Sequence, residues 1–363
     1  MTLQPGSSRR YLYMDFLRVL ACFLVIVNHT NSLVFLGATP GSATWGVSLT
    51  WYYVSKTAVT LFVMVSGACL LSKEDSYRRI LQRVVRMLLV LILFSYGYYL
   101  LKLLKAHELW PQAFDLWRFF RSIWQIRISD SLWYLYFYIG LLLMLPFCQR
   151  LAKSMKKTDF HYLLGLTFGI YLVWPMVTHY VPALALPEFF DLSLFPMFIG
   201  LFFAGHYIHA HITPKRWYIP ICGAVVICAP LIATGLTWLE TLRIPPDSRY
   251  LFMDERTTPA LPVVLCAVAM MILAKTCFAL WEERGKGLSP KAAHRLAALG
   301  ACSFTIFLLQ DCLIVETRHT LFPFLCSMMH PFLAAILWEI IVFSTLVPVA
   351  WLLKKIPFLK KLL

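Results

Sequence analysis

One arginine and one histidine in an apolar segment near the start of the chain are the side chains best suited to chemistry. Arg18 precedes His29 by eleven residues in the stretch from Asp15 to Thr30. Eleven steps of 100° amount to about 1100°, about 20° more than three full turns, so both side chains lie on nearly the same face of a helix. With a rise of about 1.5 Å per residue, they lie roughly 16 Å apart along its axis. A guanidinium binds carboxylate or phosphate oxygens, and an imidazole can accept a proton near neutral pH.

Asp15 stands one turn before Arg18, where its carboxylate could orient the guanidinium. It could equally serve as a helix N-cap or as an acidic partner of the helix dipole in the first turn. A cation and a titratable ring are costly to keep inside a bilayer, and such residues usually have a function. Asp15, Arg18 and His29 are therefore the candidate catalytic residues.

Membrane-spanning helices are the elements that must position these residues. Hydrophobic residues make up 60% of the 363-residue chain, charged residues make up 14%, and the mean hydropathy is +0.70. Apolar runs of about 20 residues can cross a bilayer. The sequence contains about ten such runs: Tyr13 to Leu36, Trp51 to Leu71, Val84 to Leu104, Leu132 to Leu151, His161 to Val181, Leu192 to His209, Trp217 to Trp238, Ala260 to Leu280, Leu296 to Val315 and Phe332 to Leu353. We expect an all-α, polytopic membrane protein in which residues 1–363 form a single domain.

The distribution of charge predicts the orientation of these helices. The formal net charge is +15, but the lysines and arginines are concentrated in alternate connections, such as those with Arg78 and Arg79 or with Lys156 and Lys157. A basic excess on one side of a membrane is typical of cytoplasmic loops, and here it does not indicate nucleic-acid binding. With an even number of spans, both termini are expected in the cytoplasm and the protein in the cell (inner or cytoplasmic) membrane.

The cysteines and histidines give no strong indication of a metal site. The ten cysteines lie almost wholly within apolar runs and form no CxxC pair, so we interpret them as buried apolar side chains. His206, His209 and His211 are close enough in sequence to hold a metal, but no carboxylate or cysteine accompanies them in that segment. We expect no metal and no permanently bound cofactor.

Two features at the expected cytoplasmic side have both a structural and a functional interpretation. Ser66 and Gly67 end the second run, where small residues allow close helix packing or contact with a ligand. Arg79, Arg83 and Arg86 follow helical spacing on one face before the third run. Such a face binds anionic lipid headgroups or fixes the topology. It can also bind a phosphate group, because guanidinium forks match phosphate oxygens.

Aromatic residues mark the region between the third and fourth runs. The stretch from Trp110 to Arg121 alternates aromatic and basic residues, which predicts an amphipathic helix on the outer surface. Trp133, Tyr134 and Tyr136 open the fourth run. They are typical of an interfacial aromatic belt, and they could also stack against a sugar.

Polar residues at membrane depth end the ninth run, where Gln310 and Glu316 lie. The carboxylates of Asp311, Glu316 and the tenth-run Glu339 are expected to pair with a cation in the bundle, the candidates being Arg18, Lys56 and Arg318. The outer loop from Glu240 to Thr258 could cover a bound substrate.

Several of these stretches together resemble the acyltransferase-3 family of bacterial membrane proteins, which includes O-acetyltransferases acting on surface polysaccharides and on the enterobacterial common antigen. The resemblance extends over essentially the whole chain. It rests on motifs that follow one another in the family's order: Asp15-Phe-Leu-Arg18 with the later His29, Leu61 to Gly67, Arg83-Val-Val-Arg86, Leu132 to Tyr136, and Ser303 to Leu308.

The sequence departs from the family pattern at two positions. The glycine that commonly follows the first-helix arginine is Val19 here. The late motif that commonly reads tyrosine, leucine, any residue, histidine is Phe307-Leu-Leu-Gln310. The second change removes a titratable group, so the family's role for that histidine cannot be assigned unchanged to Gln310.

The resemblance implies transfer of an acyl group, usually acetyl, from cytoplasmic acyl-CoA to a hydroxyl of a glycan or lipid-linked sugar. In that scheme the donor, acetyl-CoA or another acyl-CoA, is bound by Arg18, Ser66, Arg83 and Arg86. His29 is then the general base, or alternatively it is transiently acylated. The candidates for acceptor binding are Trp133, Tyr134, Tyr136, Gln310 and Glu316.

Two other classes of protein fit parts of the sequence. A carrier or exporter of a glycan or small acidic metabolite would also need buried charges, but it predicts broken helices in two related halves, and no such symmetry is visible. A non-catalytic scaffold would not need Arg18 and His29 aligned on one face. The expected partners of an acyltransferase are acyl-CoA, the sugar acceptor and the lipid bilayer.

Overall fold

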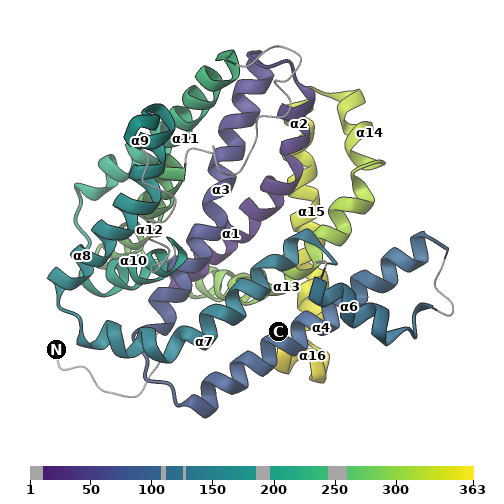
Figure 1. The fold of residues 1–363 in the computed structure, drawn as a ribbon, viewed down its shortest axis with the longest axis horizontal. Helices are drawn as coiled ribbons and strands as arrows, with labels where there is room; N and C mark the ends of the chain where they lie inside the picture. Colours follow the sequence, from purple (N-terminus) through teal and green to yellow (C-terminus); the bar gives the residue numbers. More distant parts are fainter. Residues whose placement is uncertain (1–10, 108–111, 126–127, 185–196, 244–259) are drawn as a thin grey trace.

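The computed structural model of the protein describes residues 11–107, 112–125, 128–184, 197–243 and 260–363, and these residues form helices and no strands (Figure 1). The predicted all-α fold is confirmed. Most of the outer loop expected between residues 240 and 258, and the start of the segment from Trp110, lie outside the described residues.

Fifteen labelled α-helices make up the described chain. They are α1 (Leu12–Thr30), α2 (Ser32–Gly37), α3 (Ala43–Leu70), α4 (Tyr77–Lys105), α6 (Leu116–Gln125), α7 (Trp133–Ser154), α8 (Lys157–Phe168), α9 (Trp174–Tyr180), α10 (Met197–His211), α11 (Tyr218–Arg243), α12 (Ala260–Glu283), α13 (Pro290–Thr317), α14 (Leu321–Met328), α15 (Pro331–Leu353) and α16 (Pro357–Leu362). A short π-helical turn, Gly169–Val173, joins α8 to α9.

Nine helical segments of the described chain are long and apolar enough to cross a membrane. They match nine of the predicted runs, with α1 and α2 forming one segment and α8 and α9 forming another. The remaining run, expected from Leu192 to His209, corresponds to α10, of which 15 residues from Met197 onward are described. The result is the expected polytopic membrane protein.

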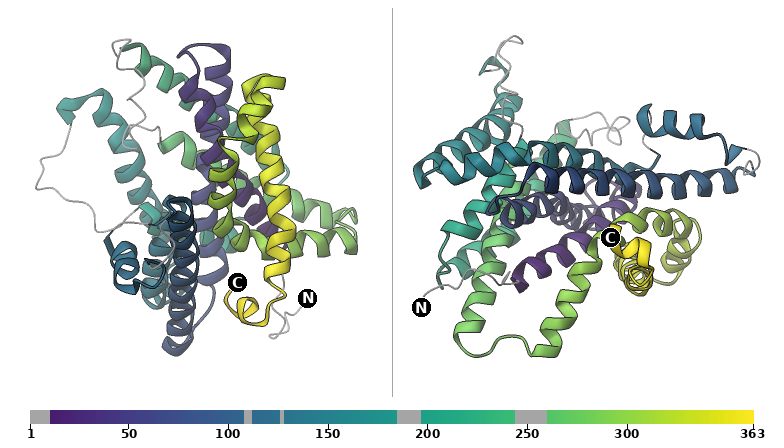
Figure 2. Two further views of the ribbon diagram at one scale, coloured as in Figure 1. Left: turned by 90° about the vertical axis from the view of Figure 1, so that its right-hand side faces the viewer. Right: turned by 90° about the horizontal axis from the view of Figure 1, so that it is seen from below.

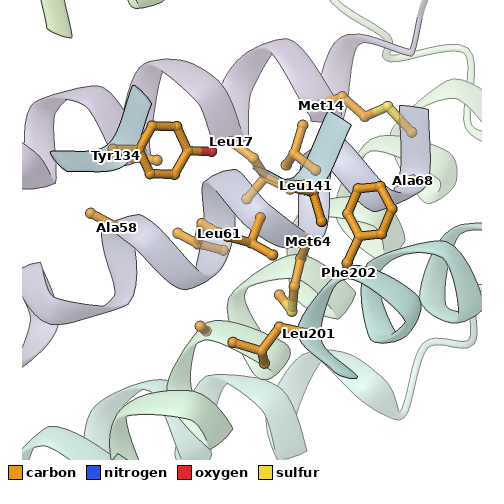
Figure 3. Packing of buried hydrophobic residues seen from close by; sticks show 14 of the residues in the cluster. Met14, Leu17, Ala58, Leu61, Met64, Ala68, Tyr134, Leu141, Leu201 and Phe202 are labelled. Carbon is orange, nitrogen blue, oxygen red and sulfur yellow. The ribbon is translucent and has the colours of Figure 1, made fainter. Parts of the chain in front are cut away.

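The centre of the bundle is formed by α3, which packs most extensively against α10 and α1 (Figure 1). Glycines make the contact with α10 very close. A Cβ atom on Gly67 would collide with the carbonyl of Phe202, and one on Gly205 would collide with the carbonyl of Met64. Small residues allow helix backbones to approach in this way in membranes. Figure 3 shows the surrounding core, in which Met14, Leu17, Leu61, Met64, Leu141 and Phe202 converge from α1, α3, α7 and α10.

Helices α1 and α13 lie side by side and run in the same direction. Asp15 lies where a side chain on Gly300 would be, and further along the Cys22 thiol donates to the carbonyl of Ser303 at 3.3 Å. Arg18 lies near the start of α1, and His29 lies near its end. Both helices therefore connect the end of the bundle that holds Arg18 with the end that holds His29.

The predicted amphipathic helix is present as α6, which folds back against the end of α4. Phe119 is buried against Tyr96 and Tyr99, while Trp117 and Phe120 on the same helix are exposed. Figure 2 shows α6 beside α4 at one edge of the bundle. It also shows α12 and α13 diverging from their short connection.

Candidate active site

A cavity of about 540 Å³ lies between α1, α3, α4, α7 and α13. Its wall includes five residues that the sequence singled out, which come from four helices: Arg18, Ser66, Arg83, Arg86 and Tyr134. We call it the donor cavity, because four of these residues were predicted to bind an acyl donor. The folded chain therefore brings together side chains separated by more than one hundred residues.

Arg18 is anchored by a buried carboxylate. Its Nη1 donates to Oδ1 of Asp15 at 3.1 Å, and its Nη2 donates to the sulfur of Cys69 at 3.1 Å. The Asp15 side chain is 1% exposed, whereas Arg18 is 35% exposed and lines the cavity. The N-cap of α1 is Tyr11, so Asp15 is not the cap. It lies in the first turn of α1, where its charge also suits the helix dipole, and it accepts a hydrogen bond from the Arg18 guanidinium.

Arg83 is oriented by Asp75, a residue of the connection between α3 and α4. Its guanidinium donates to both carboxylate oxygens, at 2.6 and 3.2 Å, and Arg79 and Gln149 donate to the same carboxylate. Burial acts to raise the pKa of Asp75, but the hydrogen bonds from Gln149, Arg83 and Arg79 outweigh it, so the pKa lies below its ordinary value. The carboxylate stays ionised at neutral pH and fixes Arg83.

Arg86 and Lys354 hold the wall of the donor cavity near the last residues of the chain. The Nε of Arg86 donates to the carbonyl of Leu362 at 2.8 Å. The Nζ of Lys354 donates to the carbonyl of Ala301 at 2.7 Å. The first bond joins α16 to α4, and the second joins the end of α15 to α13 beside the cavity.

The wall of the donor cavity combines cationic side chains with aromatic and aliphatic ones. Among the described residues its wall has the cationic side chains of Arg18, Lys73, Arg83, Arg86 and Lys354, and it has no aspartate or glutamate side chain. Aromatic and aliphatic side chains form the rest, with Phe62, Tyr134 and Phe307 packed around one another. Such a cavity suits an elongated ligand with several negative charges and a less polar arm.

His29 does not line the donor cavity. It lies half-buried near the end of α1, and the next residue, Thr30, contacts a buried carboxylate on α15. Glu339 accepts hydrogen bonds from the hydroxyl of Thr30 and from the indole of Trp51, both at 3.1 Å, and its side chain is fully buried. The expected cationic partner of Glu339 was therefore wrong. The only feature of the sequence that pointed to these contacts of Glu339 was the presence of a single glutamate in an apolar run.

A second, smaller cavity of about 230 Å³ lies further along α4 and α13. Glu316 lines it and pairs with Lys105 at 2.5 Å, so the predicted partners of this carboxylate were also wrong. Asp311 accepts hydrogen bonds from Ser129 and Ser131 rather than from an arginine. We call this the polar pocket. It lies one helical turn beyond the donor cavity on α13, since Phe307 lines one and Asp311 lines the other.

The remaining acceptor candidates lie elsewhere in the bundle. Trp133 packs near Phe198 of α10, and the Tyr136 hydroxyl donates to the carbonyl of Ile123 at 3.0 Å. Gln310 is fully buried on α13, and neither of its amide atoms has a hydrogen-bond partner within the described chain. An unpaired buried amide is costly, and it stands at the position of the family's late histidine.

The three closely spaced histidines of α10 do not form a metal site in the described chain. No group of three or more histidine, cysteine, aspartate or glutamate side chains within it could hold a metal ion. His209 instead is hydrogen-bonded through Nδ1 to the Tyr13 hydroxyl at 2.7 Å. All ten cysteines are free.

Comparison with protein families gives one match, to the family described as "Acyltransferase domain", over residues 11–355. No curated protein and no solved structure matches the chain. The matched range includes every described residue that lines the two cavities except Leu363 of the donor cavity wall.

Proposed function

The chain belongs to this acyltransferase family, and on that premise we propose that it is a membrane-embedded O-acyltransferase that moves an acyl group from acyl-CoA to a sugar hydroxyl. We take the acyl group to be acetyl and the acceptor to be a cell-surface glycan or lipid-linked sugar. The apolar helices support a multi-pass membrane protein. Its proposed location is the cell (inner) membrane with both termini in the cytoplasm, because the basic residues are concentrated in alternate connections.

The observation that carries this proposal is the charge of the donor cavity. Five cationic side chains line it without an aspartate or glutamate side chain from the described residues. Coenzyme A carries several phosphate charges on its nucleotide and a long, less polar pantetheine arm. Arginine forks bind phosphate oxygens in a bidentate manner. In our proposal Arg83 and Arg86 bind the phosphates, and the arm passes Arg18 and Ser66 toward the interior of the bundle.

His29 is the proposed general base. Its imidazole accepts the proton of the acceptor hydroxyl while the oxygen bonds to the thioester carbonyl carbon. The carbon–sulfur bond then breaks, and the departing thiolate takes the proton to become free CoA. In the two-step alternative, His29 itself is acylated first and the sugar hydroxyl then removes the acyl group. The axial separation of about 16 Å between Arg18 and His29 is comparable with the reach of an extended pantetheine arm.

The polar pocket supports entry of the acceptor from the other end. It offers carboxylate, ammonium and hydroxyl groups of the kind that bind sugar hydroxyls, including Lys102, Asp311 and Glu316. It adjoins the donor cavity along α13, because Phe307 lines one cavity and Asp311 lines the other. Donor and acceptor would then approach the base from opposite ends of the bundle.

A transfer assay with a matched histidine control tests the proposal. Purified protein in liposomes is given acetyl-CoA and a membrane glycan extract, and free CoA thiol is measured with and without the extract. We expect His29→Ala to lower kcat by about 10²-fold to 10⁴-fold, as loss of a general base does, with unchanged acetyl-CoA affinity. The exposed His319→Ala variant should retain activity. Full activity of His29→Ala would contradict the role of the base, and glycan-independent thiol release would contradict the acceptor class.

A further inference from the structure

One apolar cavity of the described chain shares no lining residue with the cavities proposed for the two substrates. It has a volume of about 960 Å³ and lies between α1, α12 and α13. It shares no lining residue with the donor cavity. On α1, Phe16 and Leu20 face this cavity, whereas Arg18 faces the donor cavity. We call it the lateral groove.

The lateral groove is apolar along most of its length. Leu273 and Phe278 of α12 form one wall, and Leu296 and Leu299 of α13 form the other. Helices α12 and α13 follow one another in the chain but diverge from their connection, as Figure 2 shows. In a membrane, a groove of this kind is open to the acyl chains of lipids.

Two cationic side chains occupy one end of the groove. Lys291 and Arg295 both line it, and their spacing of four residues places them on the same face of α13. Both are exposed, and neither forms an ion pair with a carboxylate of the described chain. Glu282 and Glu283, at the nearby end of α12, do not line the groove. The cations are therefore available to an anion that enters it.

The cationic end lies at the depth of lipid headgroups. Trp281 lines the same end and is 47% exposed, and tryptophan is enriched at the interface between membrane and water. Arg295 precedes Gly300, a residue of the donor cavity wall, by five positions in α13. The end of the groove therefore lies at the same side of the bundle as Arg18 and the other donor-cavity arginines.

We propose that the lateral groove is a binding site for an anionic phospholipid. An acyl chain lies along Leu20, Leu273 and Leu296, and the headgroup phosphate binds Lys291 and Arg295. The length of the apolar trough favours a lipid over a soluble phosphate compound, which would leave the trough without an occupant. A net negative headgroup complements two unpaired cations, whereas a zwitterionic one brings its own cation. This site goes beyond the proposed acyl transfer and does not depend on it.

Photocrosslinking in vesicles tests the site. The full-length protein is reconstituted in phosphatidylcholine vesicles that contain a trace of a lipid probe with a diazirine on one acyl chain. The probe is phosphatidylglycerol in one sample and phosphatidylcholine in the other. Labelled peptides are identified by mass spectrometry. We expect the phosphatidylglycerol probe to label α12 and α13 at the groove about thirtyfold more than the phosphatidylcholine probe, since the two cations near the membrane surface together contribute about 2 kcal/mol to binding of anionic lipid.

Variants separate the parts of the site. Lys291→Gln with Arg295→Gln should reduce phosphatidylglycerol labelling of the groove to the level of phosphatidylcholine. Lys215→Gln with Arg216→Gln, a cationic pair outside the groove, should leave the preference unchanged. Leu273→Trp, which fills the trough, should reduce labelling by both probes. Equal labelling by the two probes, or a preference that survives removal of Lys291 and Arg295, would overturn the proposal. Loss of labelling on addition of CoA would also overturn it, because the cations would then serve the donor.

Discussion

The guanidinium of Arg18 lies 3.1 Å from the carboxylate of Asp15, and the two side chains end in different surroundings. Asp15 is closed off between α1 and α13, while Arg18 remains open to the donor cavity. A buried acceptor that holds an accessible cation acts as a positioning residue. The sequence shows only that Asp15 and Arg18 are one helical turn apart. The structure shows that Asp15 is buried and that Arg18 faces the donor cavity.

Removing the charge of Asp15 tests this relationship. Asp15→Asn keeps the size of the side chain next to Gly300 but weakens a charge-assisted hydrogen bond, which is worth about 1.5–3 kcal/mol. We expect the KM for acetyl-CoA to rise about tenfold, with a smaller change in kcat. Asp159→Asn, which neutralises a carboxylate in the first turn of α8 that does not line the donor cavity, is the matched control. Equal effects of the two changes would assign Asp15 a purely structural role.

Because of Asp75, which orients Arg83 in the donor cavity, we expect the stability of the fold to depend on pH. Its pKa is lowered in the folded protein by its hydrogen-bond partners, so the ionised form stabilises the fold at pH values above its ordinary pKa. That contribution is lost as the pH falls through the lowered value. Asp75→Asn should therefore destabilise the protein by about 2 kcal/mol at pH 7, the scale of a lost charged hydrogen bond.

The difference in stability between Asp75→Asn and the unchanged protein should shrink as the pH is lowered below about 4, where the Asp75 carboxylate is protonated in the unfolded chain before it is protonated in the folded protein. Thermal unfolding in detergent at a series of pH values measures it. A destabilisation that stays constant across that range would show that charge on Asp75 does not support the fold.

The close contact between α3 and α10 predicts that replacing different glycines by alanine has very different effects on stability. Gly205→Ala places a methyl group against the backbone carbonyl of Met64, which cannot move away as a side chain can. We expect a loss of stability of at least about 3 kcal/mol, on the scale of severe overpacking. Gly223→Ala on α11 meets nothing within 4 Å and should be neutral. Thermal unfolding compares them, and similar melting temperatures would contradict the observed packing.

Much of the fold follows from apolar runs, because their length alone fixes which segments can cross a bilayer. The clustering of Arg18, Ser66, Arg83, Arg86 and Tyr134 also agrees with the motifs of the resemblance. Each of these residues stands at a predictable end of a helix.

What the sequence could not provide is the register between helices. The partners of Asp311, Glu316 and Glu339 come from other helices, and hydropathy does not encode which residues of two helices lie at the same depth. For the same reason no role could be assigned to Asp75 or Lys354 from the sequence. Their roles depend on contacts with α4 and α13 that only the folded chain reveals.

The most direct test of the account is the affinity of purified protein for acetyl-CoA, measured by titration calorimetry for Arg18→Ala and for Arg78→Ala. Arg18 lines the donor cavity, and the exposed Arg78 does not. Loss of one charge-assisted phosphate or carbonyl contact is expected to weaken binding by about tenfold or more for Arg18→Ala, with Arg78→Ala close to the unchanged protein. If Arg18→Ala binds acetyl-CoA as tightly as the unchanged protein, the donor does not occupy this cavity and the account is wrong.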